Sequence, residues 1–238
     1  MIAARSLAAP LRGGLRPRPG AARRRADAPR YPALRACAQH LLATAVGWLC
    51  APLSVAGAEH LDRLDGPTLL VANHASHLDA PVVLAALPSA VRARLAVAAA
   101  EDRFFESRLL GLAVSVGLGA FPFPRGRAVG LLRARRLLDD GWHVLLFPEG
   151  TRSRDGRRGR FRRGAAHLAR SAGVPLLPIG IDGTHALLPP GAARPRRGPV
   201  RLRFGDVWRP PDGLDVEAIT AELAARVDQL TSPEGDRS

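Results

Sequence analysis

The 238-residue chain is predicted to fold as a single α/β domain, in which helices flank a mixed β-sheet behind an N-terminal membrane-associating helix. The prediction rests on two short apolar runs that each lead directly into a cluster of polar residues, within 68–79 and 143–153. Brief apolar runs bounded by polar residues are typical of buried strands. Two such strand ends indicate one crevice at the carboxyl edge of an α/β sheet, where these folds usually bind ligands.

The chain begins with a basic segment and an apolar segment that are expected to precede the domain. Residues 1–32 are rich in Arg, Pro, Ala and Gly without apolar periodicity, which predicts a disordered arm. Residues 33–53 are mostly apolar but short for a membrane span, so we expect an interfacial or shallowly inserted helix. Removal of this region as a secretory signal peptide, with cleavage near Ala58, is the alternative. Residues 54–231 should form the domain and 232–238 a frayed tail.

Within the domain, the apolar patterns predict strands and helices that largely alternate. Strands are expected at 69–72, 94–99, the start of 143–153, 174–180 and 200–207. Helices are expected at 80–87, 104–116, 128–140, 161–172 and 214–230. The Gly/Pro-rich residues 117–125 are expected to form a connection without regular structure. Residues 154–163, rich in Arg and Gly, are interpreted either as a solvated loop or as an anion-attracting lip beside a substrate.

The first polar cluster contains a histidine and an aspartate whose spacing suits a catalytic pair. His74 and Asp79 are five positions apart, and on one unbroken helix their side chains would point about 140° apart. They can meet only if His74 lies in the turn before a helix and Asp79 in its first turn, with Ser76 as a plausible N-cap. A histidine held by a carboxylate can act as a general base toward a hydroxyl. His77 competes for this role, but residues two apart do not face each other on a helix.

The two clusters together resemble a known family. Asn73-His74-x-Ser76-x-x-Asp79, followed by Phe147-Pro-Glu-Gly-Thr-Arg-Ser153, is similar to the motifs of glycerolipid acyltransferases, best known as 1-acylglycerol-3-phosphate acyltransferases. The resemblance covers about residues 53–185. It implies transfer of a fatty acyl group from acyl-coenzyme A or acyl carrier protein to a lipid hydroxyl. With 1-acylglycerol 3-phosphate as the acceptor, the product is phosphatidic acid.

The resemblance also implies roles for residues of the first cluster. His74 would remove the proton of the acceptor hydroxyl, and Asp79 would orient the imidazole and support its positive charge. The alkoxide would attack the thioester directly, without an acyl-enzyme. Asn73, Ser76 and Ser153 are expected to support this site.

Residues of the second cluster are expected to bind the substrates. The resemblance places Glu149 against the glycerol part of the acceptor, and Arg125, which ends the preceding Gly/Phe-rich segment, against its phosphate. Backbone N–H groups near Gly150 and Thr151 are candidate donors to the oxyanion of the tetrahedral intermediate. Arg152 offers a planar, permanently charged group suited to a phosphate.

The positive charge of the chain is concentrated in two regions. The net charge is +14, and residues 1–30 contribute +7 while residues 125–170 contribute +9. This distribution suits a phosphate-bearing substrate and an anionic membrane surface. Nucleic acid is not an expected partner, because helix-turn-helix, zinc-finger and aromatic-platform signatures are missing. Cys37 and Cys50 lack metal-ligand spacing, and neither a metal nor a resident cofactor is expected.

The sequence therefore predicts an acyltransferase of phospholipid biosynthesis at the cytoplasmic face of a membrane. Its expected partners are membrane lipids and acyl-coenzyme A or acyl carrier protein. Glycerol 3-phosphate, lyso-ornithine lipid or another lysophospholipid could replace the favoured acceptor. A non-catalytic membrane- or lipid-binding protein on the same scaffold is the alternative from another class.

Overall fold

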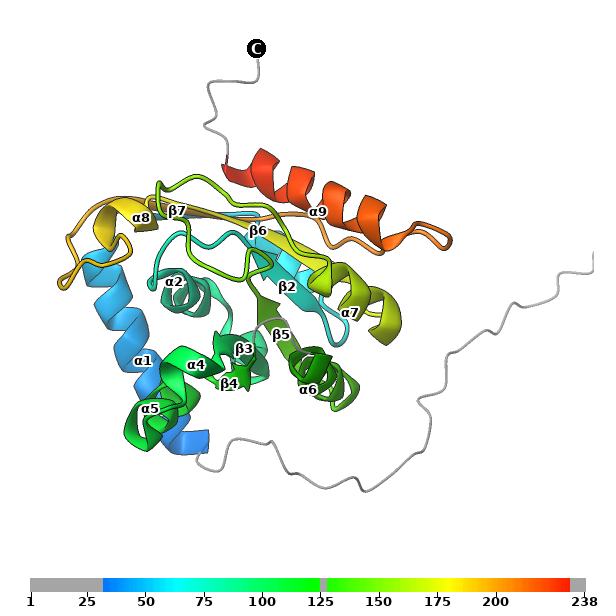
Figure 1. Cartoon of the computed structure of the whole chain (residues 1–238). Helices are drawn as coiled ribbons and strands as arrows, with labels where there is room; N and C mark the ends of the chain where they lie inside the picture. Colours follow the sequence, from blue (N-terminus) through cyan, green and yellow to red (C-terminus); the bar gives the residue numbers. More distant parts are fainter. Residues whose placement is uncertain (1–31, 125–127, 232–238) are drawn as a thin grey trace, which may run out of the picture.

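In the computed structural model, which describes residues 32–124 and 128–231, helices flank a seven-stranded sheet (Figure 1). The strands lie in the order β1-β7-β6-β2-β5-β3-β4. They are β1 (Leu53–Ala56), β2 (Leu69–Ala72), β3 (Leu95–Ala100), β4 (Ala120–Phe123), β5 (His143–Leu146), β6 (Leu176–Asp182) and β7 (Val200–Phe204). β6 and β7 pair antiparallel and the other neighbours pair parallel, so the predicted mixed α/β sheet is confirmed.

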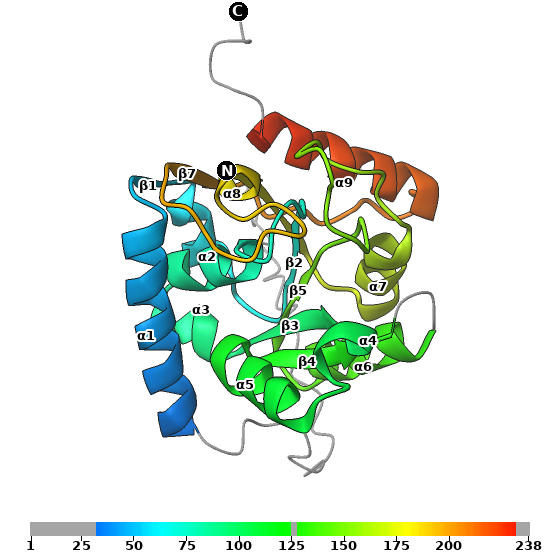
Figure 2. The ribbon, with the colours of Figure 1, turned by 60° about the vertical axis from the view of Figure 1, so that its left-hand side comes forward.

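Helices cover both faces of this sheet (Figures 1 and 2). They are α1 (Pro32–Leu49), α2 (Asp79–Ala86), α3 (Ser89–Ala93), α4 (Glu101–Phe104), α5 (Arg108–Leu118), α6 (Ala128–Asp139), α7 (Gly164–Ala172), α8 (Thr184–Leu187) and α9 (Val216–Thr231). A 3₁₀ helix, η1 (Ala58–Arg63), follows β1. Parallel strands need crossover connections, and the helices between β2, β3, β4 and β5 provide them.

Alternation along the strands divides the core into two layers. Leu70 and Ala72 of β2 face α1 and α2, whereas Leu69 and Val71 face α6, α7 and α9. Successive strand residues point to opposite faces, so the uninterrupted apolar run of β2 buries all four side chains. The predicted bounds of this strand, 69–72, are confirmed.

Helix α1 is part of this core. It packs against α2 and α5, and its residues Val46 and Leu49 are buried. Near its start, the buried Arg35 side chain donates from Nη2 to the carbonyl of Leu95 at 2.6 Å. Within the described part of the chain, no helix has both the length and the apolar character needed to cross a membrane.

The predicted helix at 33–53 is too long at its C-terminal end. Helix α1 ends at Leu49, and Leu53 already begins β1. The apolar residues after Leu49 serve the core and the sheet, because Cys50 is fully buried and β1 pairs with β7. Apolar periodicity alone could not separate the helix from the strand that follows it.

The prediction of an irregular connection at 117–125 is also wrong in part. Helix α5 continues to Leu118, Gly119 caps it in the left-handed region at φ 67°, and β4 begins at the next residue. Pro122 suggested a break, but β4 is the outermost strand and needs hydrogen bonds on one side only. Proline is tolerated in such a strand.

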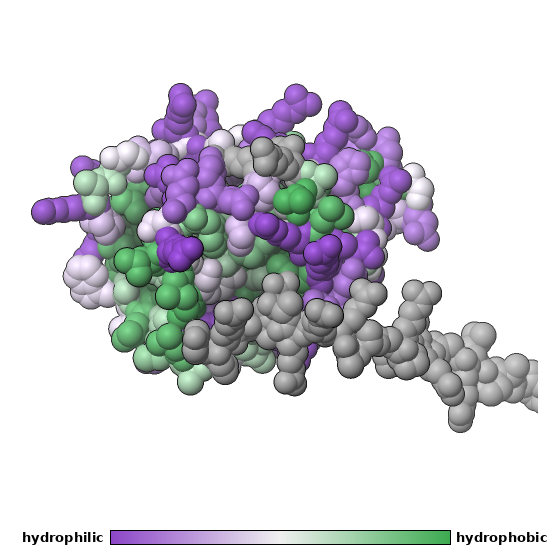
Figure 3. All heavy atoms as spheres, turned by 60° about the horizontal axis from the view of Figure 1, so that its bottom comes forward, coloured by the Kyte–Doolittle hydropathy of each residue, from purple (hydrophilic) through white to green (hydrophobic). Residues whose placement is uncertain are grey.

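Hydrophobic residues are concentrated on the part of the surface near α5. Figure 3 shows hydrophobic residues gathered on the side of the molecule where α5 and the start of α1 lie, beside hydrophilic residues. Most of the predicted arm at 1–32, the predicted tail at 232–238 and Arg125 lie outside the described residues.

Candidate active site

The two polar clusters meet because their strands are neighbours. β2 and β5 pair in parallel with Leu69 opposite Val144 and Val71 opposite Leu146, so both strands end at the same edge. The cluster after β2 and the cluster after β5 therefore lie side by side, at the carboxyl edge where a ligand site was expected.

His74 and Asp79 form a hydrogen-bonded pair at this edge. Nδ1 of His74 lies 2.8 Å from Oδ2 of Asp79, and Asp79 is the first residue of α2. A carboxylate only accepts, so Nδ1 carries the ring proton and Nε2 remains available to a substrate. The Asp79 side chain is fully buried, whereas that of His74 is 20% exposed. The pair thus joins a buried acceptor to an accessible imidazole.

Both oxygens of Asp79 have further partners. Oδ2 accepts the backbone N–H groups of Ala75 at 2.7 Å and Ser76 at 2.8 Å. Oδ1 accepts the hydroxyl of Thr184 at 2.6 Å, and Thr184 is fully buried. The carboxylate is therefore held from three directions besides the imidazole.

Thr184 is a site residue that the sequence prediction missed. It lies 105 positions after Asp79, so no local spacing connects the two. A signal did exist, because Thr184 directly follows β6 and the turn at Gly183, and β6 is the other neighbour of β2. The rule that identified the first two clusters, polar residues at parallel strand ends, applies to this third strand end as well.

The second cluster holds His74 in place through three residues. Glu149 Oε1 accepts the backbone N–H of His74 at 2.7 Å. The N–H of Ser153 donates to the carbonyl of His74 at 2.8 Å. The ring of Phe147 stacks on the imidazole, with 4.2 Å between the ring centroids and 24° between the planes. The N–H, the carbonyl and the ring of His74 are thus all contacted by one turn.

Glu149 lies behind His74 rather than in the wall of the cavity. Its second oxygen, Oε2, accepts the N–H of Gly159 at 2.8 Å, and the residue is buried. Burial raises the pKa of Glu149, although the N–H groups of His74 and Gly159 act in the opposite direction. Both oxygens of Glu149 are thus bonded to backbone donors, and its expected contact with the acceptor stays a prediction.

The supporting residues connect the site to the neighbouring strand and loops. The side-chain amide of Asn73 exchanges two 2.8 Å hydrogen bonds with the backbone of Ile181, which joins the end of β2 to β6. The hydroxyl of Ser76 donates to the carbonyl of Leu188 at 2.9 Å. Ser76 is not the N-cap of α2, because the helix begins at Asp79.

Gly150 and Thr151 differ in what their backbone offers. Gly150 has φ 74°, in the left-handed region that favours glycine, and its N–H donates to the carbonyl of Phe147 at 3.1 Å. The N–H of Gly150 therefore already has a backbone partner. Both residues line the cavity described next, and Thr151 is exposed there.

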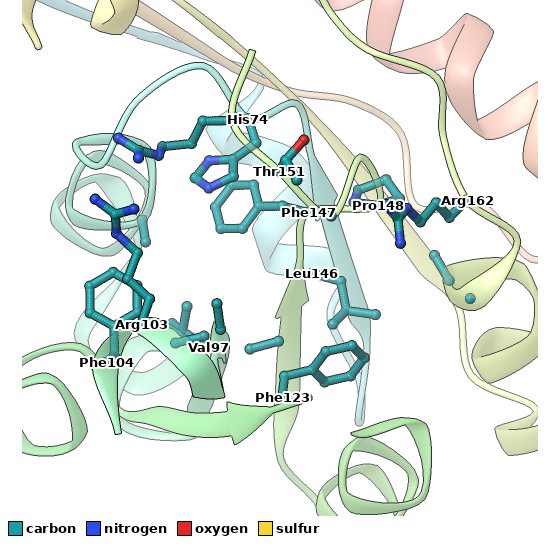
Figure 4. A pocket seen from close by; sticks show the side chains of 18 of the residues that line it. His74, Val97, Arg103, Phe104, Phe123, Leu146, Phe147, Pro148, Thr151 and Arg162 are labelled. Atoms are coloured by element: carbon teal, nitrogen blue, oxygen red, sulfur yellow. The ribbon is translucent and has the colours of Figure 1, made fainter. Parts of the chain in front are cut away.

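A cavity of about 720 Å³ opens beside His74 (Figure 4). Polar and cationic side chains also line it, among them His77, Arg103, Arg152 and Arg154. The rest of the wall is mainly apolar and comes from β3, β4, β5, α5, α6 and the turn after β5. It includes Val97, Leu118, Phe123, Leu131, Leu146 and Phe147. This volume is in the range of small-molecule sites, and the cavity combines a polar end with an apolar one.

His77 faces the same cavity but differs from His74. Its ring meets Phe104 edge-on, with 5.7 Å between the centroids. Burial, with the charges of Arg152, Arg103 and His74, lowers the pKa of His77 to about 4. It is therefore neutral at pH 7.

The described residues suggest no metal centre. Among residues 32–124 and 128–231, no group of three or more His, Cys, Asp and Glu side chains is arranged to hold a metal ion. Cys37 is exposed and Cys50 is buried, and both are free thiols. Burial raises the pKa of Cys50.

Comparison with known proteins connects this geometry to one group. The acyltransferase family model matches residues 52–182. The chain is 34% identical over 180 residues to the chloroplastic 1-acyl-sn-glycerol-3-phosphate acyltransferase LPAT1 of Arabidopsis thaliana, covering 74% of this chain and 48% of that protein. It is 35% identical over 142 residues to the corresponding chloroplastic protein BAT2 of Brassica napus, covering 58% of this chain and 39% of that protein. The chain thus spans about half or less of the length of these two relatives.

A solved structure shares the fold. The crystal structure of the 1-acyl-sn-glycerophosphate (LPA) acyltransferase PlsC from Thermotoga maritima superposes with a TM-score of 0.70 and 25% sequence identity. The match covers 85% of this chain and 81% of that chain. The similarity therefore extends over most of both proteins.

Proposed function

Since the chain belongs to the acyltransferase family, we propose that it transfers a fatty acyl group to the free hydroxyl of 1-acylglycerol 3-phosphate. The product is phosphatidic acid, and the donor is the thioester of acyl-coenzyme A or acyl carrier protein. The relatives are named for this acceptor, and the arginines around the cavity offer cationic groups for its phosphate.

The observation that carries the proposal is the His74–Asp79 pair at the polar end of a largely apolar cavity. Asp79 accepts from Nδ1 and fixes the tautomer in which Nε2 is the base. Nε2 takes the proton of the acceptor hydroxyl as the oxygen attacks the thioester carbonyl. The negative charge that Asp79 carries next to the ring stabilises the imidazolium that forms.

The reaction then completes without a covalent enzyme intermediate. The attack produces a tetrahedral intermediate. The N–H of Thr151 is the candidate donor to its oxyanion, since the N–H of Gly150 already donates to the carbonyl of Phe147. The carbon–sulfur bond breaks as the carbonyl re-forms. The leaving thiolate takes the proton from His74, which returns the base to its neutral form. In this scheme Glu149 is a positioning residue for His74.

The rest of the cavity suits the two substrates. Arg103 and Arg152 lie at the polar end, close enough to affect the charge of His77, and they are suited to the acceptor phosphate. The apolar end, which β3, β4 and α6 line, is suited to a fatty acyl chain. A lipid with a charged head and an apolar tail matches both ends at once.

The proposal includes association with the cytoplasmic face of a membrane through α1. Leu34, Leu41 and Trp48 are exposed and seven positions apart, so they lie on one side of the helix. The ring of Trp48 also stacks under the guanidinium of Arg197 at 4.5 Å. An apolar stripe that ends in a tryptophan suits the interface of a bilayer.

The test is acyl transfer from acyl-coenzyme A and from acyl carrier protein to a panel of acceptors. The panel contains lysophosphatidic acid, glycerol 3-phosphate, lyso-ornithine lipid and lysophosphatidylcholine. We expect transfer to lysophosphatidic acid, a loss of roughly a thousandfold in His74→Ala, and a much smaller loss in His77→Gln. Comparable losses in the two variants would contradict the assignment of the base.

Two other outcomes would change the proposal in defined ways. Transfer to a different acceptor, lost in His74→Ala, would preserve the mechanism and replace the substrate. Binding of lipid without transfer from either donor would favour the non-catalytic lipid-binding alternative.

A further inference from the structure

Helix α5 exposes apolar side chains that the folded domain does not cover. Leu109 is 81% exposed, the largest value among the large apolar residues that the structure describes, and Leu112 on the same helix is 56% exposed. Leu110 is exposed as well. A single exposed leucine is ordinary, but a cluster on one short helix indicates an interaction site.

The same stretch of chain forms one wall of the cavity. Arg103 and Phe104 of α4 and Leu118 at the end of α5 line it. Residues 101–118 therefore have an inner side toward the substrate cavity and an outer side that carries the leucines.

Helix α5 also packs against α1 (Figures 1 and 2). A Cβ at Gly119, which caps α5, would meet the Arg35 guanidinium of α1. The hydrophobic residues in Figure 3 gather on this side of the molecule. The outer surface of α5 thus lies on the same side of the molecule as the start of α1, which the basic residues 1–30 precede in the sequence.

We propose that α5 is a membrane-docking helix whose outer leucines enter the boundary between headgroups and acyl chains of an anionic bilayer. Docked in this way, residues 101–118 stand between the bilayer and the cavity, and a lyso-lipid reaches the cavity past them without crossing bulk water. This inference deepens the proposed function and rests on it for the identity of the lipid. The docking itself does not require catalysis.

Charge favours a bilayer over a second copy of the chain as the partner. Residues 1–30 carry a net charge of +7 and the whole chain +14. Basic segments beside an apolar surface are attracted to anionic lipids. Two copies of a chain with a net charge of +14 would instead repel each other, because like charges oppose their contact.

The first test measures binding of the full chain to vesicles of phosphatidylcholine and phosphatidylglycerol by co-sedimentation. The variant Leu109→Gln/Leu112→Gln replaces the two leucines that we expect to enter the bilayer. Each of them should contribute roughly a factor of ten to the partitioning of the protein from water onto the vesicle. We expect its vesicle affinity to fall at least tenfold. The control is Val129→Gln/Leu132→Gln on α6, where Leu132 is 57% exposed, much like Leu112. The control should bind within about twofold of the wild type.

The second test locates the contact on the wild-type chain. Vesicles should slow amide hydrogen exchange in residues 108–118. Unchanged exchange there, unchanged affinity in the α5 variant, or an equal loss in the α6 control would each overturn the inference. A wild-type dimer that the α5 variant dissociates in the absence of lipid would also overturn it, because a second copy would then cover the leucines.

A third comparison separates docking from the chemistry. His74→Ala should bind vesicles as the wild type does. The α5 variant should acylate a short-chain, water-soluble lyso-acceptor at the wild-type rate but lose at least tenfold on an acceptor embedded in vesicles. If neither the wild type nor any of the variants transfers an acyl group, the proposed function fails. The vesicle affinities still decide whether α5 docks.

Discussion

The carboxylate of Glu149 accepts the backbone N–H of His74 at 2.7 Å, across 75 positions of the chain. The motif that follows β5 thereby fixes the backbone of the residue that follows β2, while Asp79 fixes its ring. Contacts to the backbone of His74 and contacts to its ring together determine where Nε2 points, and this division of roles leads to distinguishable effects of substitution.

Glu149→Gln should lower kcat more than it changes the KM of the acceptor. The amide presents an NH₂ group to one of the two N–H donors, so His74 shifts, and a shift of the base costs roughly tenfold to a hundredfold in rate. Steady-state kinetics with varied acceptor concentration measures both constants. A large rise in KM with an unchanged kcat would instead support direct contact between Glu149 and the acceptor.

Thr184→Val should impair both stability and catalysis, although Thr184 lies outside the two motifs. The substitution keeps the shape but leaves Oδ1 of the buried Asp79 without its hydroxyl donor, which costs about 1–3 kcal/mol. We expect a kcat reduced roughly tenfold. Thr184→Ser restores the hydroxyl and should recover most of the rate. Equal loss in the Val and Ser variants would show that packing, not the hydrogen bond, matters.

Phe147→Leu should loosen the imidazole of His74 without removing any of the hydrogen-bonding partners of that residue. The stacked rings, 4.2 Å apart, contribute about 0.5–1.5 kcal/mol beyond the area they bury. We expect a lower kcat with the same pH dependence, and near wild-type behaviour for Phe147→Tyr. A pH profile displaced in Phe147→Leu would mean that the ring acts on the basicity of His74 rather than on its position.

His77 should make the protein less stable as the pH falls from 6.5 to about 4. Burial and neighbouring arginines lower its pKa from 6.5 to about 4 in the folded chain, so the unfolded chain binds more protons across this range. Its contribution is present above pH 6.5 and is lost on acidification. Urea unfolding of wild type and His77→Gln at both ends of the range should give a difference on the order of 1 kcal/mol after allowance for solvent screening.

Two other groups with shifted pKa values also affect the stability at acid pH. Their contribution is the same in the wild type and in His77→Gln, so the comparison of these two proteins removes it. The pKa of the buried His143 is lowered, so it acts in the same direction as His77. The pKa of Glu149 is raised, so it acts in the opposite direction. If the wild type and His77→Gln lose stability in parallel, His77 is not responsible for the acid sensitivity.

Local patterns in the sequence were enough to predict part of the fold and the pairing of His74 with Asp79. β2 has the predicted bounds because an apolar run between polar residues needs no distant information. The meeting of His74 and Asp79 followed from a spacing that only a turn before a helix can satisfy. Both predictions depend on fewer than ten consecutive residues.

The remaining features depend on which strands are neighbours. Pro122 looked incompatible with a strand until the outermost position of β4 was known. The bond between Thr184 and Asp79 exists because β6 lies next to β2, and the bond between Glu149 and His74 because β5 lies on its other side. Strand order is a property of the whole chain, and no local pattern contains it.

The position of β1 has a consequence for the order in which the protein can fold. β1 pairs with β7 through contacts such as Leu53 with Val200, and the carbonyl of Leu49 accepts the N–H of Gly198. A ribosome makes α1 and β1 first and their strand partner about 150 residues later, after an interval of roughly ten seconds or more. Until then β1, the outermost strand at its end of the sheet, has no strand to pair with. We therefore expect β1 to stay unpaired on the nascent chain and to join the sheet only after β7 has been made.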